Sequence, residues 1–323
     1  MLWRQGPGWP MAIVAFLVAV LAVPPTSAEA ATARTRARPA AKKKTVHKPR
    51  AVPLRHAVST RQRLPVSTDA NGLGLRSNVA LVVDQATGKS VVEKNANDLQ
   101  PIASITKLMT ALVVLDGAQP MSRRIPITDE DVDTERGSRS RLAIGTELTR
   151  NDLLHLALMA SENRAAHALG RSYPGGMPAF VEAMNEKARA LGMERTRFVD
   201  PTGLSSSNVS TAADLVKLVH AAHTKNLIRQ YSTDPYYEVH VVGRDVRFHN
   251  TNRLVASDGW DIGLSKTGFI NEAGRCLVMQ AIIDGRALTI VLLDSWGKLS
   301  RIGDANRIRK WLTSAAPGRR GAA

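Results

Sequence analysis

Ser104 and Lys107 stand three residues apart at the start of an apolar run that is typical of a helix. On a helix, this spacing places the serine hydroxyl and the lysine amine on one face, one turn apart. A serine is a weak nucleophile unless a neighbouring base removes its proton, and a lysine can be that base only while it is uncharged. Burial or a second cation keeps a lysine uncharged. The pair therefore predicts an activated serine, provided that one of these conditions is met.

Two further short motifs follow in the chain. Ser161 and Asn163 form a Ser-x-Asn motif, and Lys266-Thr267-Gly268 lies about 100 residues later, within an expected strand. Each motif alone is weak, because the chain repeats the first two elsewhere, at 295–298 and 206–208. The combination in this order is more informative. We interpret Lys266 as the second cation that keeps the first lysine uncharged.

The hydrophobic pattern predicts which elements carry these motifs. An Asp-Gly pair at 284–285 between two apolar runs indicates a hairpin, and Thr149 with Asp152 resembles a capping box. The expected strands are 78–83, 90–93, 262–269, 276–283 and 287–293, and the expected helices are 104–116, 151–159, 178–191, 211–223 and 299–313. This order predicts an α/β fold of the α+β type, in which both chain ends build a five-stranded antiparallel sheet flanked by helices, with an inserted, mostly helical subdomain.

The first 63 residues differ in composition from the rest of the chain. Arg4, an apolar run over 11–23 and small residues over 26–30 have the order of a secretory signal peptide, and this run is too short for a membrane span. Residues 31–63 contain 11 Lys or Arg and no Asp or Glu, which is typical of a disordered tether. The expected division is a signal peptide (1–30), a basic tether (31–76), a folded domain (77–315) and a flexible tail (316–323).

The tether carries +11 of the formal net charge of +16, so the high basicity describes the tether more than the folded part. An exported chain does not meet nucleic acid in its normal work, and we expect no nucleic-acid partner. Weak contact between the tether and anionic envelope polymers is the alternative to a bare solvated linker. We expect a periplasmic protein without a transmembrane span once the signal peptide is removed.

Neither a metal nor another cofactor is expected. Three alternating aspartates within 128–135 resemble the opening of a calcium loop, but Thr134 and Ser140 stand where that motif needs Gly and Glu, so we interpret the segment as a solvated loop. None of the helical histidines belongs to a His-Glu-x-x-His motif: His155, His167, His220 and His223. Cys276 is the single cysteine, which excludes an intrachain disulfide and indicates a buried thiol.

The three motifs together are the signature of penicillin-binding proteins and class A β-lactamases. The stretches SITKLMTALVVLD, LMASENRAA, DPTGLS, NTNRL and KTGFINEAGRC resemble the low-molecular-mass, serine-type D-alanyl-D-alanine peptidases, most of all the D-alanyl-D-alanine endopeptidases of penicillin-binding protein 7 type. The resemblance covers roughly residues 78–313 and implies a DD-peptidase/β-lactamase-like fold. It also implies a serine endopeptidase that cuts D-alanyl cross-links in peptidoglycan and is covalently inhibited by β-lactams. Glu162, where the general motif has Asp, is the one departure.

The resemblance also assigns roles to the residues of the motifs. Ser104 would attack the D-alanyl carbonyl and become acylated, with Lys107 as general base and Ser161 as proton relay. Asn163 would hold Lys107 and the substrate amide. Lys266 would attract the anionic substrate, Thr267 would offer a hydroxyl to its carboxylate, and Gly268 would leave room for its backbone. The N–H groups of Ser104 and Phe269 would form the oxyanion hole.

Other functions remain open. A DD-carboxypeptidase would trim terminal D-alanine, but such enzymes often carry a further β domain and an amphipathic C-terminal anchor, and only 55 residues follow Gly268. A β-lactamase needs a glutamate that activates the deacylating water, and Glu182, within an expected helix, is a poor candidate. A non-catalytic wall-binding protein would have no reason to keep the serine, both lysines and the asparagine together.

Overall fold

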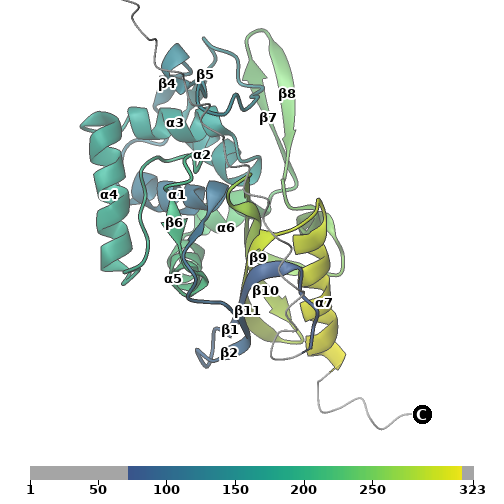
Figure 1. The fold of residues 1–323 in the computed structure, drawn as a ribbon. Helices are drawn as coiled ribbons and strands as arrows, with labels where there is room; N and C mark the ends of the chain where they lie inside the picture. The colour runs from purple at the N-terminus through teal and green to yellow at the C-terminus, as the bar shows by residue number, and fades with distance from the viewer. Residues whose placement is uncertain (1–71, 315–323) are drawn as a thin grey trace, which may run out of the picture. The chain divides into compact units, whose positions relative to one another are not determined.

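A five-stranded antiparallel sheet joins the two ends of the described chain (Figure 1). Its strands lie in the order β2-β1-β11-β10-β9, so that β1 pairs with the last strand. The strands are β1 (Ser77–Asp84), β2 (Ser90–Lys94), β9 (Asp261–Ile270), β10 (Gly274–Ile283) and β11 (Arg286–Ser295). The predicted sheet from both chain ends is confirmed.

The turn between β10 and β11 has the chemistry that its sequence predicts. Asp284 and Gly285 have φ angles of 51° and 73°, both in the left-handed region that a type I′ hairpin turn requires. The turn fixes the pairing of Ile283 with Arg286, and β9 continues the same ladder on the other side of β10. Strand β9 is an edge strand of the sheet, and Lys266, near its middle, pairs with Val278.

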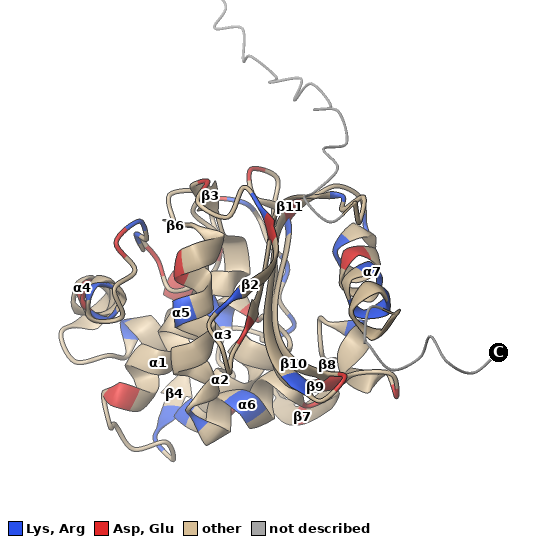
Figure 2. Cartoon of the chain, turned by 90° about the horizontal axis from the view of Figure 1, so that it is seen from below, with Lys and Arg blue, Asp and Glu red and all other residues tan. Residues whose placement is uncertain are grey.

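Helices cover the two faces of the sheet unequally. Figure 2 shows α7 on one face and the other helices on the opposite face. The bounds are α1 (Lys107–Asp116), α2 (Arg150–Met159), α3 (Asn163–Arg171), α4 (Gly176–Ala190), α5 (Ala212–His223), α6 (Asn226–Thr233) and α7 (Ser300–Ser314). Two hydrophobic cores follow from this arrangement, a large one on the side of α1–α6 and a smaller one beneath α7. Burial of apolar side chains on both faces explains why β1, β10 and β11 are almost continuously apolar.

Several short elements complete the fold. They are β3 (Gln100–Pro101), β4 (Arg124–Pro126), β5 (Glu147–Thr149), β6 (Val209–Ser210), β7 (Tyr236–Val241), β8 (Arg244–His249) and the 3₁₀ turns η1 (Ala103–Thr106), η2 (Asp129–Asp131) and η3 (Arg253–Ala256). The β7–β8 hairpin and α6 have no counterpart among the sequence predictions. The hairpin turns at Val242-Gly243, which is not one of the dipeptides that favour a two-residue turn.

One predicted helix boundary needs correction, and it is the one at Ser104. The helix expected from Ser104 begins with the 3₁₀ turn η1, and regular α-helix starts only at Lys107. The capping box at α2 is confirmed, because Thr149 Oγ1 accepts from Asp152 N over 3.1 Å and the Asp152 carboxylate accepts from Thr149 N over 3.1 Å.

The interpretation of 128–135 as a solvated loop was wrong at Asp131. Its side chain is fully buried and lies 2.7 Å from Nδ1 of His167 and 2.9 Å from Nη2 of Arg171, both on α3. Burial opposes ionisation of Asp131, but these hydrogen bonds outweigh it and hold its pKa below the usual value. The acidic segment is therefore anchored to α3, the helix that also begins with Asn163.

The computed structural model describes residues 72–314, which lie within one compact unit, Arg61–Ala323. The predicted signal peptide, most of the tether and the tail lie outside the described residues. Leu75 is buried, and the N–H of Arg76 donates to Asp304 on α7 over 3.1 Å, so packing begins before residue 77. No helix among residues 72–314 combines the length and apolar character needed to cross a membrane.

Candidate active site

The turn η1 presents Ser104 above the start of α1. Ala103, just before the serine, is buried and has a φ of 47°, a left-handed conformation that is unfavourable for alanine. Ser104 is partly exposed, whereas the side chain of Lys107 is completely buried. Nζ of Lys107 lies 2.9 Å from Oγ of Ser104. The predicted alignment of the serine hydroxyl with the lysine amine is therefore present, although a 3₁₀ turn provides it.

Lys107 has three hydrogen-bond acceptors around its amine. Nζ lies 2.9 Å from Ser104 Oγ, 2.7 Å from Asn163 Oδ1 and 2.6 Å from the carbonyl oxygen of Thr202. An uncharged amine has two N–H donors and one lone pair. Asn163 and Thr202 can occupy both donors, since neither of these oxygens carries a proton. The lone pair is then directed at the hydroxyl of Ser104, as a general base requires.

Burial is the main reason why Lys107 can lose its proton. It lowers the pKa of Lys107 to about 7, even though the negative charges of Asp200 and Glu162 oppose this shift. Lys266, the cation that we expected to keep Lys107 uncharged, does interact with it electrostatically, but burial is the larger cause. Lys266 is itself 1% exposed, and burial together with the charge of Lys107 moves its pKa well below the usual value. Repulsion between the two lysines disfavours charging both of them at once, and burial acts on each.

The junction between α2 and α3 supplies the second motif. Ser161 has a φ of 60°, again in the left-handed region, and its Oγ accepts a hydrogen bond of 2.8 Å from Nζ of Lys266. Asn163 is the first residue of α3, and its Nδ2 donates to Ser138 Oγ over 3.0 Å. Ala103 and Ser161 are two of the seven non-glycine residues with positive φ among residues 72–314, and both lie at the site, where strain of about 1–3 kcal/mol each is commonly retained.

Strand β9 forms the opposite wall. Lys266 and Gly268 lie toward Ser161 and Ser104, and Oγ1 of Thr267, between them in the strand, donates to Thr251 Oγ1 over 2.7 Å. A Cβ at Gly268 would lie 2.9 Å from the carbonyl oxygen of Ile102 and 3.2 Å from N of Ser104. The glycine is thus required by the nucleophile turn, a reason that sequence reasoning missed.

A loop that the sequence predicted only as a turn packs against η1. The carboxylate of Asp200 accepts from N of Thr202 over 2.6 Å and N of Gly203 over 2.7 Å. A Cβ at Gly203 would overlap the carbonyl group of Ala103, and the φ of Gly203 is 79°. Asn208, from the second Ser-x-Asn motif, donates to Thr106 Oγ1 over 3.1 Å. Turn-forming residues at 200–203 were the available signal, but their contact with η1 is visible only in the structure.

Arg301 on α7 is a further member of the site that sequence reasoning missed. Its Nη1 donates to the carbonyl oxygen of Gly268 over 3.1 Å, and burial and the charge of Arg275 lower its pKa to about 10. It brings a further, partly buried cation close to Lys266. Its position on α7, 35 residues after Lys266, gives no local sequence signal.

The remaining candidates lie elsewhere. Cys276 is buried, and burial raises its pKa to about 12, as befits a packed, unreactive thiol. His155 is stacked between Tyr231 and Tyr237, with ring centroids 4.2 and 3.9 Å away, and Nε2 lies 3.0 Å from Asp234 Oδ2 without the alignment of a hydrogen bond. Among residues 72–314, no group of three or more His, Cys, Asp or Glu side chains could hold a metal ion.

A serine and a buried lysine on one turn, faced by a second serine–lysine pair beside an antiparallel sheet, define a class of acyl-transfer enzymes in which lysine replaces histidine as the base. The chain belongs to the D-alanyl-D-alanine carboxypeptidase family, peptidase family S11, which it matches over residues 66–296. It is a serine-type D-alanyl-D-alanine peptidase.

Known proteins of this family agree with the fold and the chemistry. The chain is 50% identical to the D-alanyl-D-alanine endopeptidase of Pseudomonas aeruginosa over 242 residues, which cover 74% of this chain and 77% of that protein. Its structure is similar to that of the Streptomyces K15 DD-transpeptidase, with a TM-score of 0.69, 27% identity and coverage of 74% and 98% of the two chains. Penicillin-binding protein D2 of Listeria monocytogenes, solved in its cefotaxime-bound form, gives a TM-score of 0.66 with 28% identity and coverage of 73% and 96%.

Proposed function

We propose that the protein is a serine DD-endopeptidase that hydrolyses D-alanyl cross-links in peptidoglycan through an acyl-enzyme on Ser104. The contact between Nζ of buried Lys107 and Oγ of Ser104 carries this proposal, because it joins a nucleophile to a base whose pKa of about 7 leaves about half of it uncharged at neutral pH. The 50% identity to a D-alanyl-D-alanine endopeptidase supports the choice of substrate.

Acylation follows from the arrangement of the amine. Uncharged Lys107 donates to Asn163 and Thr202 and accepts the proton of Ser104, whose Oγ attacks the D-alanyl carbonyl carbon. The C–N bond then breaks, and Ser161, hydrogen-bonded to Lys266, passes a proton to the departing amine. Water releases the acyl group in the second half of the reaction.

Binding groups surround the reacting carbonyl in this proposal. The N–H groups of Ser104 and Phe269 stabilise the oxyanion. The hydroxyl of Thr267, the amine of Lys266 and the positive charge of Arg301 bind a substrate carboxylate, and the Arg301–Gly268 hydrogen bond supports this assignment. Asn163 holds Lys107 and the substrate amide. A β-lactam would acylate the same serine, as the cefotaxime-bound form of a structural relative suggests.

The second candidate is a DD-carboxypeptidase that removes terminal D-alanine. The family description favours it, since the matching family is one of D-alanyl-D-alanine carboxypeptidases. The two activities share every step at Ser104 and differ only in the size of the leaving group. Either activity acts on the cell wall, and with the proposed signal peptide and basic tether this supports a periplasmic protein, whose tether contacts anionic envelope polymers weakly.

Digestion of purified muropeptides by the wild type and by Ser104→Ala tests the proposal. Products are analysed by mass spectrometry. Conversion of cross-linked dimers to monomers by the wild type alone is expected. Loss of only terminal D-alanine would replace the endopeptidase by the carboxypeptidase, and an unchanged digest with both proteins would overturn the enzymatic proposal.

A further inference from the structure

An exposed apolar surface lies at the end of the sheet nearest to the site. Phe269, Trp296 and Leu299 are 51%, 58% and 58% exposed, and they are three of the eight large apolar side chains that are exposed among residues 72–314. Phe269 is the penultimate residue of β9, and the other two lie between β11 and α7. Such a concentration on one side of a protein marks a surface that contacts another molecule.

Strand pairing places Phe269 beside Arg275 and brings the end of β11, from which the segment with Trp296 and Leu299 continues, to the same end of the sheet. Phe269 pairs with Arg275 on β10, and Arg275 pairs with Ser295 on β11, directly before Trp296. Paired residues of antiparallel strands share one face. The guanidinium carbon of Arg275 lies 4.4 Å from the centroid of the Phe269 ring. We call the surface of Phe269, Arg275, Trp296 and Leu299 the sheet-end platform.

The platform continues the catalytic groove on one defined side. Phe269 directly follows Gly268, which touches the nucleophile turn, and Arg301 joins α7 to the carbonyl oxygen of Gly268. Thr267 lies two residues before Phe269 on the same face of β9. Since the proposed function assigns the carboxylate of the leaving group to Thr267 and Arg301, the platform lies beyond that carboxylate, on the leaving-group side.

The length of the platform distinguishes the two kinds of leaving group. It crosses β9, β10 and β11, and two strand spacings amount to about 10 Å. A terminal D-alanine is one residue, about 3.5 Å long, and ends at the carboxylate beside Thr267. In a cross-link, the leaving amine belongs to a second stem peptide, which continues past this point. Only the cross-linked substrate is therefore long enough to cover the platform.

The charges at the platform suit a stem peptide, which carries carboxylates. Arg275 and Arg301 lie close enough for the positive charge of Arg275 to lower the pKa of Arg301. The nearby acids are engaged elsewhere: Glu272 forms an ion pair of 2.9 Å with Arg136, and Asp294, 5% exposed, accepts a hydrogen bond from Asn78. The platform is thus basic as well as apolar, and it attracts an anionic peptide.

We propose that the sheet-end platform binds the departing stem peptide of a cross-link and so determines the preference for endopeptidase over carboxypeptidase substrates. This inference rests on the proposed function. Trp296 supplies apolar contact area and Arg275 supplies charge, and both lie outside the groups that act on the scissile bond. Their loss weakens binding of cross-linked substrate and leaves acylation by small substrates intact.

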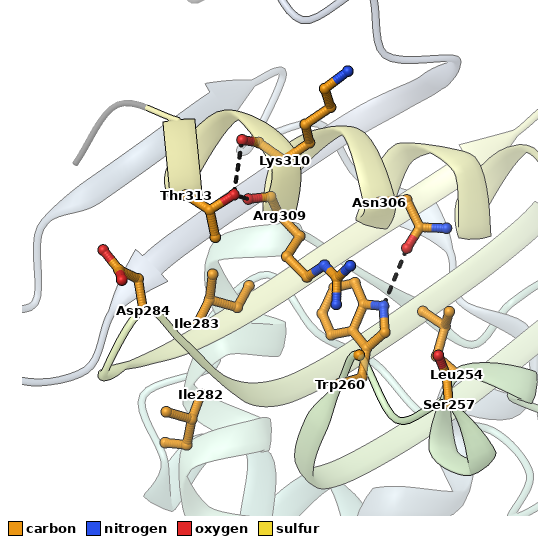
Figure 3. A pocket seen from close by; sticks show the side chains of 11 residues that line it. Leu254, Ser257, Trp260, Ile282, Ile283, Asp284, Asn306, Arg309, Lys310 and Thr313 are labelled. Carbon is orange, nitrogen blue, oxygen red and sulfur yellow. Dashed lines mark hydrogen bonds between the residues drawn. The ribbon is translucent and has the colours of Figure 1, made fainter. Parts of the chain in front are cut away.

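The test compares two substrates and three variants. The kcat/KM is measured for a purified cross-linked muropeptide dimer and for a monomeric pentapeptide, with the rate of penicillin acylation as a measure of the intact site. The test variants are Trp296→Ala and Arg275→Gln. The matched control is Trp260→Ala at the far end of β9, where Asp261 pairs with Ile282. Figure 3 shows Arg309 beside the ring of Trp260, with its guanidinium carbon 5.3 Å from the ring centroid, at a cavity of about 640 Å³.

We expect Trp296→Ala to lower kcat/KM for the dimer about tenfold, as for a well-placed aromatic contact, and to change the pentapeptide value and penicillin acylation less than about twofold. Arg275→Gln shows the same selectivity and removes the salt dependence of dimer cleavage, and the control keeps the wild-type ratio. An equal loss on both substrates, or no loss on the dimer, would overturn the inference while leaving the proposed function standing. A wild-type protein that cleaves no dimer would overturn both this inference and the proposed endopeptidase function.

Discussion

Gly268 lies directly against Ser104, since a Cβ on the glycine would approach the backbone nitrogen of the serine to 3.2 Å. The contact joins β9, which carries Lys266, to the 3₁₀ turn that carries the nucleophile. The two walls of the site therefore pack backbone against backbone at this point, and the distance between them has little freedom.

Gly268→Ala should displace this turn. The added Cβ would also lie 2.9 Å from the carbonyl oxygen of Ile102, and neither contact is with a flexible side chain. A shift of about 1 Å at the nucleophile costs on the order of 100-fold in rate. The rate of labelling by a fluorescent penicillin measures this loss. Gly303→Ala on α7 is the matched control, because its Cβ would meet only Arg307 at 3.5 Å; wild-type labelling is expected, and equal rates for both variants would refute the argument.

Acylation should depend on pH through Lys107. Burial lowers the pKa of this lysine to about 7, and only the uncharged amine accepts the serine proton. The rate constant of penicillin acylation should therefore rise about tenfold per pH unit below pH 7 and level off above it. Stopped-flow or labelling measurements from pH 5.5 to 9 give the profile. A rate that is constant from pH 6 to 8, or that falls over this range, would exclude Lys107 as the base.

Glu162→Gln should move that profile in a predictable direction. Glu162 is 9% exposed, its negative charge favours the protonated form of Lys107, and its Oε2 accepts a hydrogen bond of 2.6 Å from Ser140. Glutamine keeps an acceptor for Ser140 but removes the charge, so the pKa of Lys107 falls. The rising limb should shift to lower pH, with the plateau rate nearly unchanged. A shift to higher pH would contradict the electrostatic account.

Asp131→Ala should destabilise the domain, because it leaves Arg171 and His167 without their buried carboxylate. Removing one partner of a buried ion pair costs about 3 kcal/mol. Since hydrogen bonding lowers the pKa of Asp131 in the folded state, this contribution is present near neutral pH and is lost as the pH falls through that value. Urea denaturation at pH 7 and pH 3 measures both effects. Asp245→Ala, at a 78% exposed carboxylate paired with His240, should change nothing measurable.

The sequence predicted the parts of the fold that follow from local periodicity. The five strands of the main sheet, the capping box of α2 and the Asp284-Gly285 turn depend on residues close together in the chain, and all are present. The β7–β8 hairpin escaped prediction because its charged residues and its Val-Gly turn obscure the strand pattern. Asp131 escaped because its burial depends on α3, about 40 residues away.

The site could be predicted as a set of residues but not as an electrostatic system. Order and spacing brought Ser104, Lys107, Ser161 and Lys266 together correctly, as their hydrogen bonds show. The cause of the lowered lysine pKa was assigned to a second cation, whereas burial dominates, and burial is a property of the packed fold. Arg301 and the loop at 200–203 contact the site through tertiary packing alone.

The most direct test of the account is the location of the covalent adduct formed with penicillin. The protein is incubated with penicillin, digested, and mapped by mass spectrometry, in parallel with Ser104→Ala. The account predicts one penicilloyl group per chain, on Ser104, in the wild type and none in the variant. An adduct on any other residue, or an adduct that persists in Ser104→Ala, would contradict it.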